Sequence, residues 1–180
     1  MNRPLDTWDS TCGRTLHLRH GQLDDVGRLL EFERHLSPGT RYFRFGRFRD
    51  LHFTPKQLQW ILDPNNEENV HFVVTMIEDS AEELLATGRI LIDMSAAECQ
   101  LLIVVRDDWQ GCGLGARLTS ALCAEASRRG IPGIYCQVMP TNRVMQAFMD
   151  KCGFREVHNP DHELLVRFEK RLECGVSRPV

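Results

Sequence analysis

The chain has 180 residues, a formal net charge of −3, and 42% hydrophobic residues. This length suits a single domain, which buries about 70% of the surface that its unfolded chain exposes, and the slight acidic excess argues against a nucleic-acid binder. No apolar run reaches the roughly 18 residues of a membrane helix, and the first residues lack the apolar core of a signal peptide, so we expect neither a membrane span nor secretion.

The first third of the chain carries short strand and helix patterns. Residues 1–13 show no pattern and predict a loose leader. Alternating polar and apolar residues over 15–19 predict a strand. Apolar residues at helical spacing over 23–36 predict an amphipathic helix, which Ser37-Pro38-Gly39 is expected to end. A threonine followed by proline is typical of a helix start and predicts a second helix over 54–62.

The rest of the chain predicts a sheet with two more helices. Apolar and alternating runs predict strands at 70–77, 84–92, 98–105 and 134–138, and a final hairpin of 155–158 with 164–169. Helical spacing predicts helices over 113–129, which Gly130 ends, and over 142–151. One mixed α/β domain over 14–172 follows, with 173–180 as a tail.

The segment from Leu101 to Ala116 joins a buried strand to a helix through a glycine-rich turn. Gly111, Gly113 and Gly115 let the backbone turn sharply and bring N–H groups at the positive end of a helix close to a ligand. Such a turn predicts an anion site, most often for phosphate. It is not a nucleotide P-loop, because Lys-Ser/Thr does not follow the last glycine, and its G-x-G-x-G spacing is not the dinucleotide fingerprint.

Two motifs resemble signatures of the GNAT acetyltransferase superfamily. Q-G-C-G-L-G, from Gln110 to Gly115, matches Q/R-x-x-G-x-G/A, and N-R-V-M-Q-A-F-M-D-K-C-G-F, from Asn142 to Phe154, is similar to the second signature. The resemblance covers about Leu101 to Val157. It implies the GNAT fold, a mostly antiparallel, twisted central sheet of six to seven strands flanked by about four helices.

A third segment, L-S-P-G-T-R-Y-F-R-F from Leu36 to Phe45, interleaves aromatic and basic residues. Core aromatics with solvated arginines would explain it equally well. It also resembles L-S-x-x-S/T-x-Y-x-R-F in the GNAT domains of Pat-like bacterial protein lysine acetyltransferases, which share V-x-D-x-W-Q-G-x-G-L-G, as Val105 to Gly115 read here. The resemblance implies that this segment lines the acceptor side of the cleft.

The resemblance also implies acetyl-CoA as acyl donor. In the family, the turn binds the pyrophosphate, the splayed central strand pairs with the pantetheine arm and a main-chain N–H near its end polarises the thioester carbonyl, while the asparagine lies near the thiol end. The implied cofactor-binding residues are Ile103, Val104, Val105, Gln110, Gly111, Cys112, Gly113, Leu114, Gly115, Ala116, Asn142 and Phe148.

Acyl transfer to an amine also needs groups that handle protons. A lysine amine with a pKa near 10.4 costs about 4 to 5 kcal/mol to deprotonate at pH 7. Pat-like domains usually carry a glutamate where this chain has Gln100. Glu98, two residues earlier on the same strand face, is either the base, acting through a water, or an ordinary exposed acid. Many GNAT enzymes place a tyrosine acid where this chain has Met149, which leaves Tyr42 as the candidate.

The cysteines and histidines indicate no metal site. The seven cysteines are an odd number without paired C-x-x-C spacing, and the seven histidines lack H-x-x-x-H or H-E-x-x-H spacing. Free cysteines suit a reducing cytoplasm. Cys112 lies in the glycine-rich turn, but no histidine and aspartate partners can be placed beside it, so we interpret it as a space filler and not a nucleophile.

The leading hypothesis is an acetyl-CoA-dependent N-acetyltransferase that transfers the acetyl group directly to a primary amine, on a protein lysine or a small molecule. Two alternatives stay open. Gln100 and Met149 at the proton-handling positions favour a domain that binds acyl-CoA without turnover and acts as a sensor; a third reading is a phosphate-binding domain for another nucleotide. GNAT domains often dimerise, so the resemblance allows a homodimer, and we expect neither nucleic acid nor membrane as partner.

Overall fold

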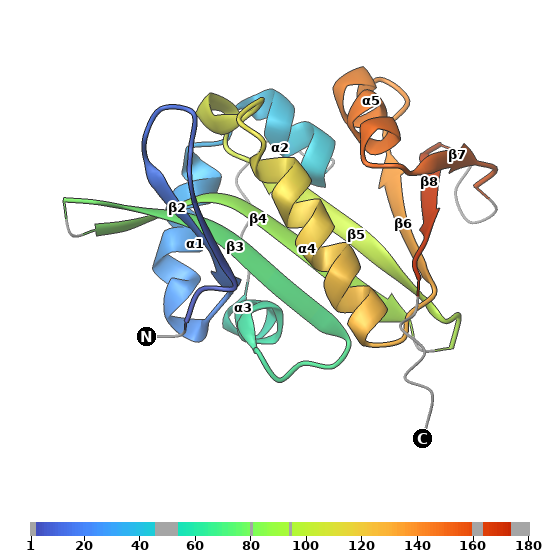
Figure 1. The fold of residues 1–180 in the computed structure, drawn as a ribbon, viewed down its shortest axis with the longest axis horizontal. Coiled ribbons are helices and arrows are strands. Elements are labelled where there is room, and N and C mark those ends of the chain that lie inside the picture. The colour runs from blue at the N-terminus through green and yellow to red at the C-terminus, as the bar shows by residue number, and fades with distance from the viewer. Residues whose placement is uncertain (1–2, 46–53, 80, 94, 160–163, 174–180) are drawn as a thin grey trace.

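The computed structural model describes residues 3–45, 54–79, 81–93, 95–159 and 164–173. These residues form one eight-stranded sheet in the order β1-β2-β3-β4-β5-β6-β8-β7, in which β5 and β6 are the one parallel pair (Figure 1). The mixed α/β fold with a mostly antiparallel sheet is therefore confirmed. The sheet is larger than the six to seven strands expected, and the described residues hold five α-helices in place of about four.

Most elements lie within a few residues of their predicted positions. The strands are β1 Asp6–Asp9, β2 Thr15–His20, β3 Asn69–Glu78, β4 Ala81–Asp93, β5 Glu98–Val105, β6 Gly133–Val138, β7 Arg155–Val157 and β8 Val166–Arg171. The helices are α1 Val26–Arg34, α2 Pro38–Phe45, α3 Pro55–Leu62, α4 Leu114–Arg128 and α5 Arg143–Lys151, with short 3-10 turns η1 Leu23–Asp25 and η2 Asp107–Trp109. The predicted C-terminal hairpin is confirmed, because β7 pairs with β8.

The N-terminal edge of the sheet departs from expectation. Residues 6–9 form β1, so the prediction of a loose leader over 1–13 is wrong for this stretch. The Arg117 guanidinium of α4 lies 4.5 Å from the centre of the Trp8 ring, and its Nη1 is 2.8 Å from Asp6 Oδ2. The strand thus pairs with β2 and is further held by Arg117, a residue far along the chain that no local pattern relates to residues 6–9.

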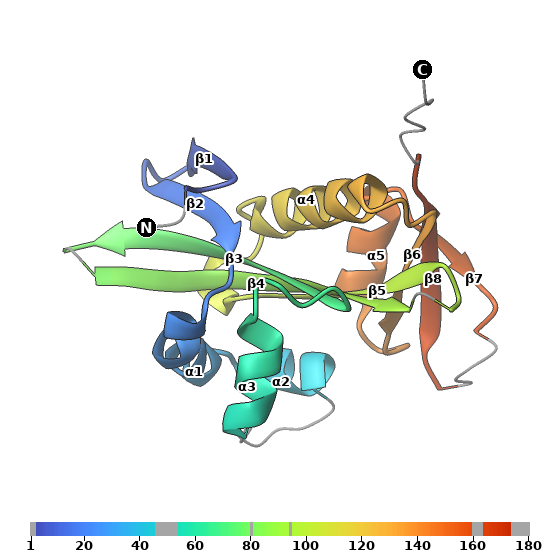
Figure 2. The same ribbon diagram turned by 90° about the horizontal axis from the view of Figure 1, so that it is seen from below.

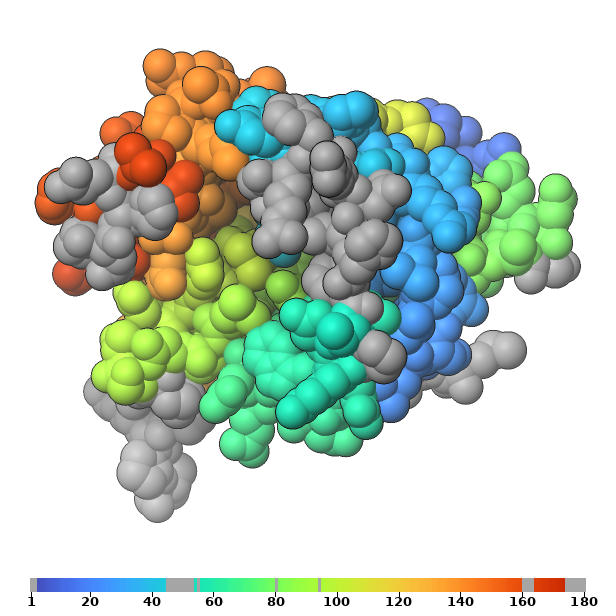
Figure 3. All heavy atoms as spheres, turned by 180° about the vertical axis from the view of Figure 1, so that it is seen from behind, coloured from blue at the N-terminus to red at the C-terminus, as the bar shows by residue number. Residues whose placement is uncertain are grey.

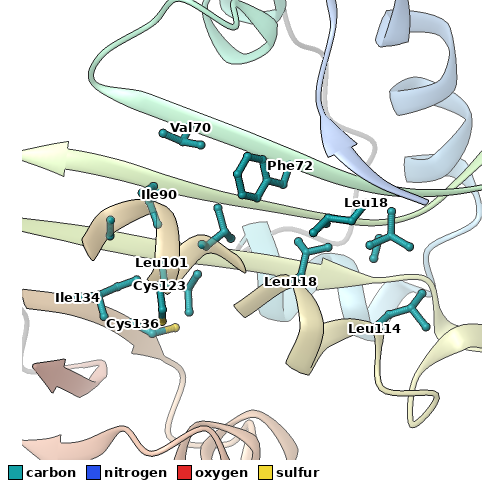
Figure 4. Packing of buried hydrophobic residues seen from close by; sticks show 14 of the residues in the cluster. Leu18, Val70, Phe72, Ile90, Leu101, Leu114, Leu118, Cys123, Ile134 and Cys136 are labelled. Carbon is teal, nitrogen blue, oxygen red and sulfur yellow. The ribbon is translucent and has the colours of Figure 1, made fainter. Parts of the chain in front are cut away.

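Helix α4 covers one face of the sheet (Figure 2). The predicted apolar seam of this helix is confirmed, and its leucines pack on the inward side chains of the strands (Figure 4). The close approach depends on Gly88 of β4, because a Cβ there would overlap Leu118 and lie 2.8 Å from Leu122 Cδ1. Gly130 ends the helix with a φ of +76°, as its position in the sequence predicts.

Helices α1, α2 and α3 lie on the opposite face (Figure 2). A second, smaller core lies there, formed by Leu29, Phe32, Leu36, Leu58, Val73, Leu84 and Val104. Helix α2 was not expected, because the Ser37-Pro38-Gly39 sequence was interpreted as a helix stop. Pro38 is instead the first residue of α2, where its missing N–H costs nothing, and the Thr40 N–H donates to Ser37 Oγ (3.2 Å).

Strands β5 and β6 separate after three residue pairs. Their ladder joins Glu98–Gln100 to Gly133–Tyr135, although β5 continues to Val105 and β6 to Val138. On its other side β5 pairs with β4 along its whole length. Residues 101–105 therefore present an edge toward β6 that has no registered partner among the described residues. This fork opens toward the ends of the strands near α2 and α5 (Figure 1).

Candidate active site

The glycine-rich turn connects the end of β5 to the start of α4. Gly111 and Gly113 have φ of +79° and +85°, and a Cβ at either position would meet nothing within 4 Å. The first intrahelical bond runs from the Arg117 N–H to Gly113 O (3.2 Å), so the N–H groups of Leu114, Gly115 and Ala116 have no acceptor within the helix. The turn thus presents main-chain donors to open space at the positive end of a 15-residue helix.

Gln110 fixes the turn to the strand that precedes it. Its Nε2 donates to Val105 O (3.1 Å), the carbonyl of the last residue of β5, and lies 3.4 Å from Thr40 Oγ1 of α2. The buried Trp109 packs beneath the turn in the core that α4 covers. The glutamine of the motif therefore acts through its side chain as a brace, in addition to any contact of its backbone with a ligand.

Asp107 joins the turn to α2. Its carboxylate accepts hydrogen bonds from Ser37 N (2.8 Å), Ser37 Oγ (2.8 Å) and Thr40 Oγ1 (2.7 Å). Partial burial works against the charge, but these hydrogen bonds outweigh it and lower the pKa of Asp107. These bonds tie the start of the unexpected α2, and with it the aromatic and basic segment, to the turn.

Helix α5 approaches the same turn from the other side of the fork. A Cβ at Gly115 would lie 3.3 Å from Phe148 Cζ and 3.7 Å from Val105 Cγ2, so these three predicted cofactor-binding residues meet in space. Asn142 begins α5, and its Oδ1 accepts from the Met145 N–H (3.1 Å). Met149, at the position of the family's tyrosine, is fully buried and belongs to the core.

The three residues at the end of β5 alternate between the two faces of the sheet. Ile103 and Val105 pack with the core under α4, whereas the buried Val104 belongs to the core under α1. Their main-chain groups lie on the unpartnered edge at the fork. The structure therefore offers main-chain donors and acceptors at the position where the pantetheine arm is predicted to bind.

Glu98 and Gln100 share one face of β5, as predicted, while Cys99 and Leu101 between and beyond them are buried in the core under α4. Gln100 Nε2 donates to Gln137 Oε1 (3.4 Å) at the point where β5 and β6 begin to separate. Glu98 lies in the closed part of the ladder, opposite Gly133, and its Oε2 accepts from Arg167 Nη2 (2.7 Å). The side chain at the fork, Gln100, is therefore an amide, and the carboxylate of Glu98 lies away from the fork.

Arg167 was not predicted to belong to this region. It pairs with Glu98 and Glu169, and its guanidinium stacks on the Tyr135 ring at 3.8 Å from the ring centre. Burial opposes its charge, but these carboxylates prevail and raise the pKa of Arg167. In Figure 3, which shows this face, β4 and β5 stay visible between α3 and the C-terminal strands.

Tyr42 lies in α2 on the face that carries Glu98 and Gln100. It is half-buried, and its ring centre is 5.8 Å from that of Phe43. The structure places it in the segment that was predicted to line the acceptor side. Residues 46–53, which follow this segment directly, lie outside the described residues.

Three of the described cysteines, Cys99, Cys123 and Cys136, are buried in the core. Burial raises the pKa of Cys99 and of Cys136 to about 12, which opposes formation of a thiolate. Cys112 is half-buried in the turn, with Sγ 3.8 Å from Gln110 O. Within the part of the chain that the structure describes, no group of three or more His, Cys, Asp or Glu side chains could hold a metal ion, and no helix is long and apolar enough to cross a membrane.

Comparison with known proteins places this geometry in a family. Residues 32–154 match the model of the "Acetyltransferase (GNAT) family". The chain is 29% identical over 150 residues to "Acetyltransferase PA5475" of Pseudomonas aeruginosa, covering 83% of this chain and 80% of that protein. It is also 29% identical over 142 residues to "Acetyltransferase Pat" of Mycolicibacterium smegmatis, covering 78% of this chain but 41% of Pat.

Solved structures show the same fold. The GNAT domain of S. lividans PAT superimposes with a TM-score of 0.81 at 23% identity, covering 95% of this chain and all of that domain. The expected GNAT fold and the likeness to Pat-type domains are therefore confirmed. Since the family model matches more than half of the chain, the glycine-rich turn, the fork and α5 belong to a member of the GNAT acetyltransferase family, an enzyme of the N-acetyltransferase class.

Proposed function

We propose that the chain binds acetyl-CoA at the glycine-rich turn and transfers the acetyl group directly to a primary amine. One observation carries this proposal. Two glycines in left-handed conformation face open space at the start of α4, next to a strand edge without a registered partner. Enzymes of the GNAT family use acetyl-CoA. The turn suits its pyrophosphate, and the edge of residues 101–105 suits the amide groups of its pantetheine arm.

The cofactor contacts follow from these two features. Main-chain N–H groups from Gln110 to Ala116 hold the pyrophosphate, and Phe148 closes the turn beside Gly115. Val104 and Val105 pair with the pantetheine arm, and a main-chain N–H between Ile103 and Val105 polarises the thioester carbonyl, as an oxyanion donor does. Asn142 uses its Oδ1 to cap α5, which leaves its Nδ2 to donate to the cofactor.

The residues that would transfer protons match the family's pattern less well than the residues that would bind the cofactor. Gln100 cannot accept a proton, and the Glu98 carboxylate is already engaged by Arg167. Glu98 acts as the base through a water at the fork, in competition with that ion pair. Tyr42 is the candidate acid, although a thiolate with a pKa near 8.5 leaves with little help. We place the enzyme in a reducing cytoplasm, because its cysteines lack paired spacing.

Calorimetry with acetyl-CoA, combined with a thiol-release assay over a panel of amines, tests the proposal. Gly113→Ala adds a Cβ to the open space of the turn and should weaken acetyl-CoA binding about tenfold or more, since lost hydrogen bonds to a charged group are worth about 1.5–3 kcal/mol. Gly130→Ala is the matched control. Its φ is +76°, its Cβ also meets nothing within 4 Å, and it lies at the far end of α4.

Both glycine variants carry the same backbone strain of about 1–2 kcal/mol, so a difference between them reports on the turn alone. Equal acetyl-CoA affinity in the two variants would refute the assignment of the turn. A chain that binds acetyl-CoA but releases no thiol with any amine would support the non-catalytic sensor instead, the alternative that Gln100 and the buried Met149 favour.

A further inference from the structure

Arg89 of β4 is a cation that has no counter-charge among the described residues. It shares a sheet face with Leu102 of β5, its cross-strand neighbour, because Gly88 and Ile90 on either side face α4. The face of Arg89 is therefore that of Gln100 and of helices α1 to α3. Its Nη1 is buried and has no hydrogen-bond partner, and no described carboxylate pairs with it.

The neighbourhood of Arg89 makes its charge costly. Burial, together with the nearby positive charge of Arg44 on α2, lowers the pKa of Arg89 to about 10. His71, the residue of β3 that pairs with Arg89, supplies no negative charge. Burial and the positive charges of Arg89 and Arg44 lower the pKa of His71 to about 3. Its Nε2 is hydrogen-bonded with Thr87 Oγ1. A buried charge is ordinarily paired, so this arrangement calls for an anion from outside the chain.

The position of the two arginines relates them to the fork. Helix α2 contacts β5, and the charge of Arg44 acts both on Arg89 of β4 and on the Cys136 thiol of β6, the strands on either side of β5. Arg44 therefore lies near β5, one of the two strands that form the fork. Glu33 partly offsets the charge of Arg44, whereas Arg89 lies on the face opposite α4, where the acceptor would approach the thioester.

We propose that Arg89, in the positive field of Arg44, binds a carboxylate of the acceptor, so that the acceptor is an amine that also carries a carboxylate. This inference rests on the proposed acetyl transfer. A guanidinium offers two parallel N–H donors that match the two oxygens of a carboxylate. The carboxylate could belong to a small amino acid or to an acidic side chain next to a lysine; the chemistry of recognition is the same.

A merely structural role for Arg89 predicts different behaviour. Removal of an unpaired buried charge relieves its desolvation cost, so Arg89→Gln should raise the melting temperature of the ligand-free protein. A residue that stabilised the fold would lower it. Arg128→Gln is the matched control, because it removes the same charge from an exposed site at the end of α4, where the arginine pairs with Glu125.

The central measurement compares kcat/KM for acceptor pairs that differ in charge alone: β-alanine with β-alaninamide, γ-aminobutyrate with its amide, and peptides in which lysine adjoins aspartate or asparagine. The wild-type protein should prefer the acid of at least one pair by about tenfold or more. Arg89→Gln should abolish that preference, whereas Arg128→Gln should keep it. The ratio of acid to amide, compared between variants, cancels the intrinsic reactivity of each amine.

The outcomes separate this inference from the proposed function. Thiol release at equal rates with acids and amides, in both wild type and Arg89→Gln, would overturn the carboxylate site and leave acetyl transfer standing. If no amine releases thiol, calorimetry of the same acids and amides on the CoA-loaded protein decides: acid binding that Arg89→Gln abolishes supports the site, and its absence refutes it. A preference confined to the peptides, or to the free amino acids, identifies the source of the carboxylate.

Discussion

The two sides of β5 are built in different ways. On the donor side, the backbone of the turn is held by a short-range contact, the hydrogen bond of Gln110 to Val105 five positions away, and Phe148 of α5 packs beside Gly115. On the acceptor side, the polar groups come from elements far apart in the chain. The ion pair of Arg167 with Glu98 spans 69 positions, and the hydrogen bonds of Asp107 to Ser37 span 70.

This difference follows the two ligands: the cofactor is constant among enzymes of the family, whereas the acceptor varies. A pyrophosphate is the same in every reaction, and main-chain donors at a helix start bind it without particular side chains. The proposed acceptor side instead carries particular side chains: a glutamine at the fork, an ion-paired glutamate and an arginine without a described partner. Three substitutions test how far each side depends on these contacts.

Asp107→Asn should have the largest effect, on stability. The carboxylate accepts three hydrogen bonds from Ser37 and Thr40, and hydrogen bonds to a charged group contribute about 1.5–3 kcal/mol where water does not compete. Because Asp107 is exposed and water competes for these bonds, we expect a loss of about 1–2 kcal/mol in the free energy of unfolding, measured by urea denaturation. Asp108→Asn is the control, since Asp108 pairs with Arg106 alone and does not bond α2.

The same contact predicts a pH dependence. Because the folded state lowers the pKa of Asp107, its contribution is present above the unfolded pKa of about 3.9 and is lost as the pH falls through the lower folded value. The stability gap between wild type and Asp107→Asn should therefore close in acid, below about pH 4. A gap that persists unchanged at pH 2 would show that the charge of Asp107 is not what secures α2.

Glu98→Gln should have an intermediate effect, on rate. A base that acts through water and competes with Arg167 sits at the low end of general-base contributions, so we expect kcat/KM to fall about tenfold at neutral pH. The loss should shrink as the pH approaches the pKa of the acceptor amine, because the amine then arrives neutral. The measurement is the pH profile of thiol release.

Glu169→Gln is the control for that experiment. Glu169 Oε1 lies 2.6 Å from Arg167 Nε, so this variant removes a carboxylate from the same arginine while the side chain of β5 stays intact. If both variants lower the rate equally, Glu98 serves to position Arg167 and the proton leaves by another route.

The sequence predicted the glycine-rich turn and α4 because their signals are local. The spacing of Gly111, Gly113 and Gly115 is a property of six consecutive residues, and the apolar seam of α4 repeats every turn. Thr54 and Pro55 likewise predicted the start of α3, where Gln57 N–H donates to Thr54 Oγ1 (3.3 Å). The same signal, Ser37 with Pro38, was present at α2 but was interpreted as the end of the preceding helix, because serine, proline and glycine also form turns.

The acceptor side could not be predicted in the same way. Strand alternation places Arg89 on the sheet face opposite to that of Gly88 and Ile90. Nothing in the sequence near residue 89 reveals that the charge of Arg44 acts on it and that no described carboxylate pairs with it. Gln137 and Arg167 carried no motif, and their contacts with Gln100 and Glu98 depend on how β6 and β8 pair. Met149 shows the converse. The sequence identified it as a missing tyrosine, and its full burial shows that packing selects the residue there.

Tyr42→Phe should have the smallest effect and tests the acceptor side from α2. The variant removes one hydroxyl from a half-buried ring and keeps its packing beside Phe43. Since a thiolate leaving group needs little protonation, we expect kcat to change less than about threefold. Tyr135→Phe removes the same atom from a ring that stacks under Arg167 and serves as the control. A loss of tenfold or more in Tyr42→Phe alone, with disappearance of the high-pH limb of the kcat profile, would instead make Tyr42 the acid and show that α2 supplies chemistry as well as shape.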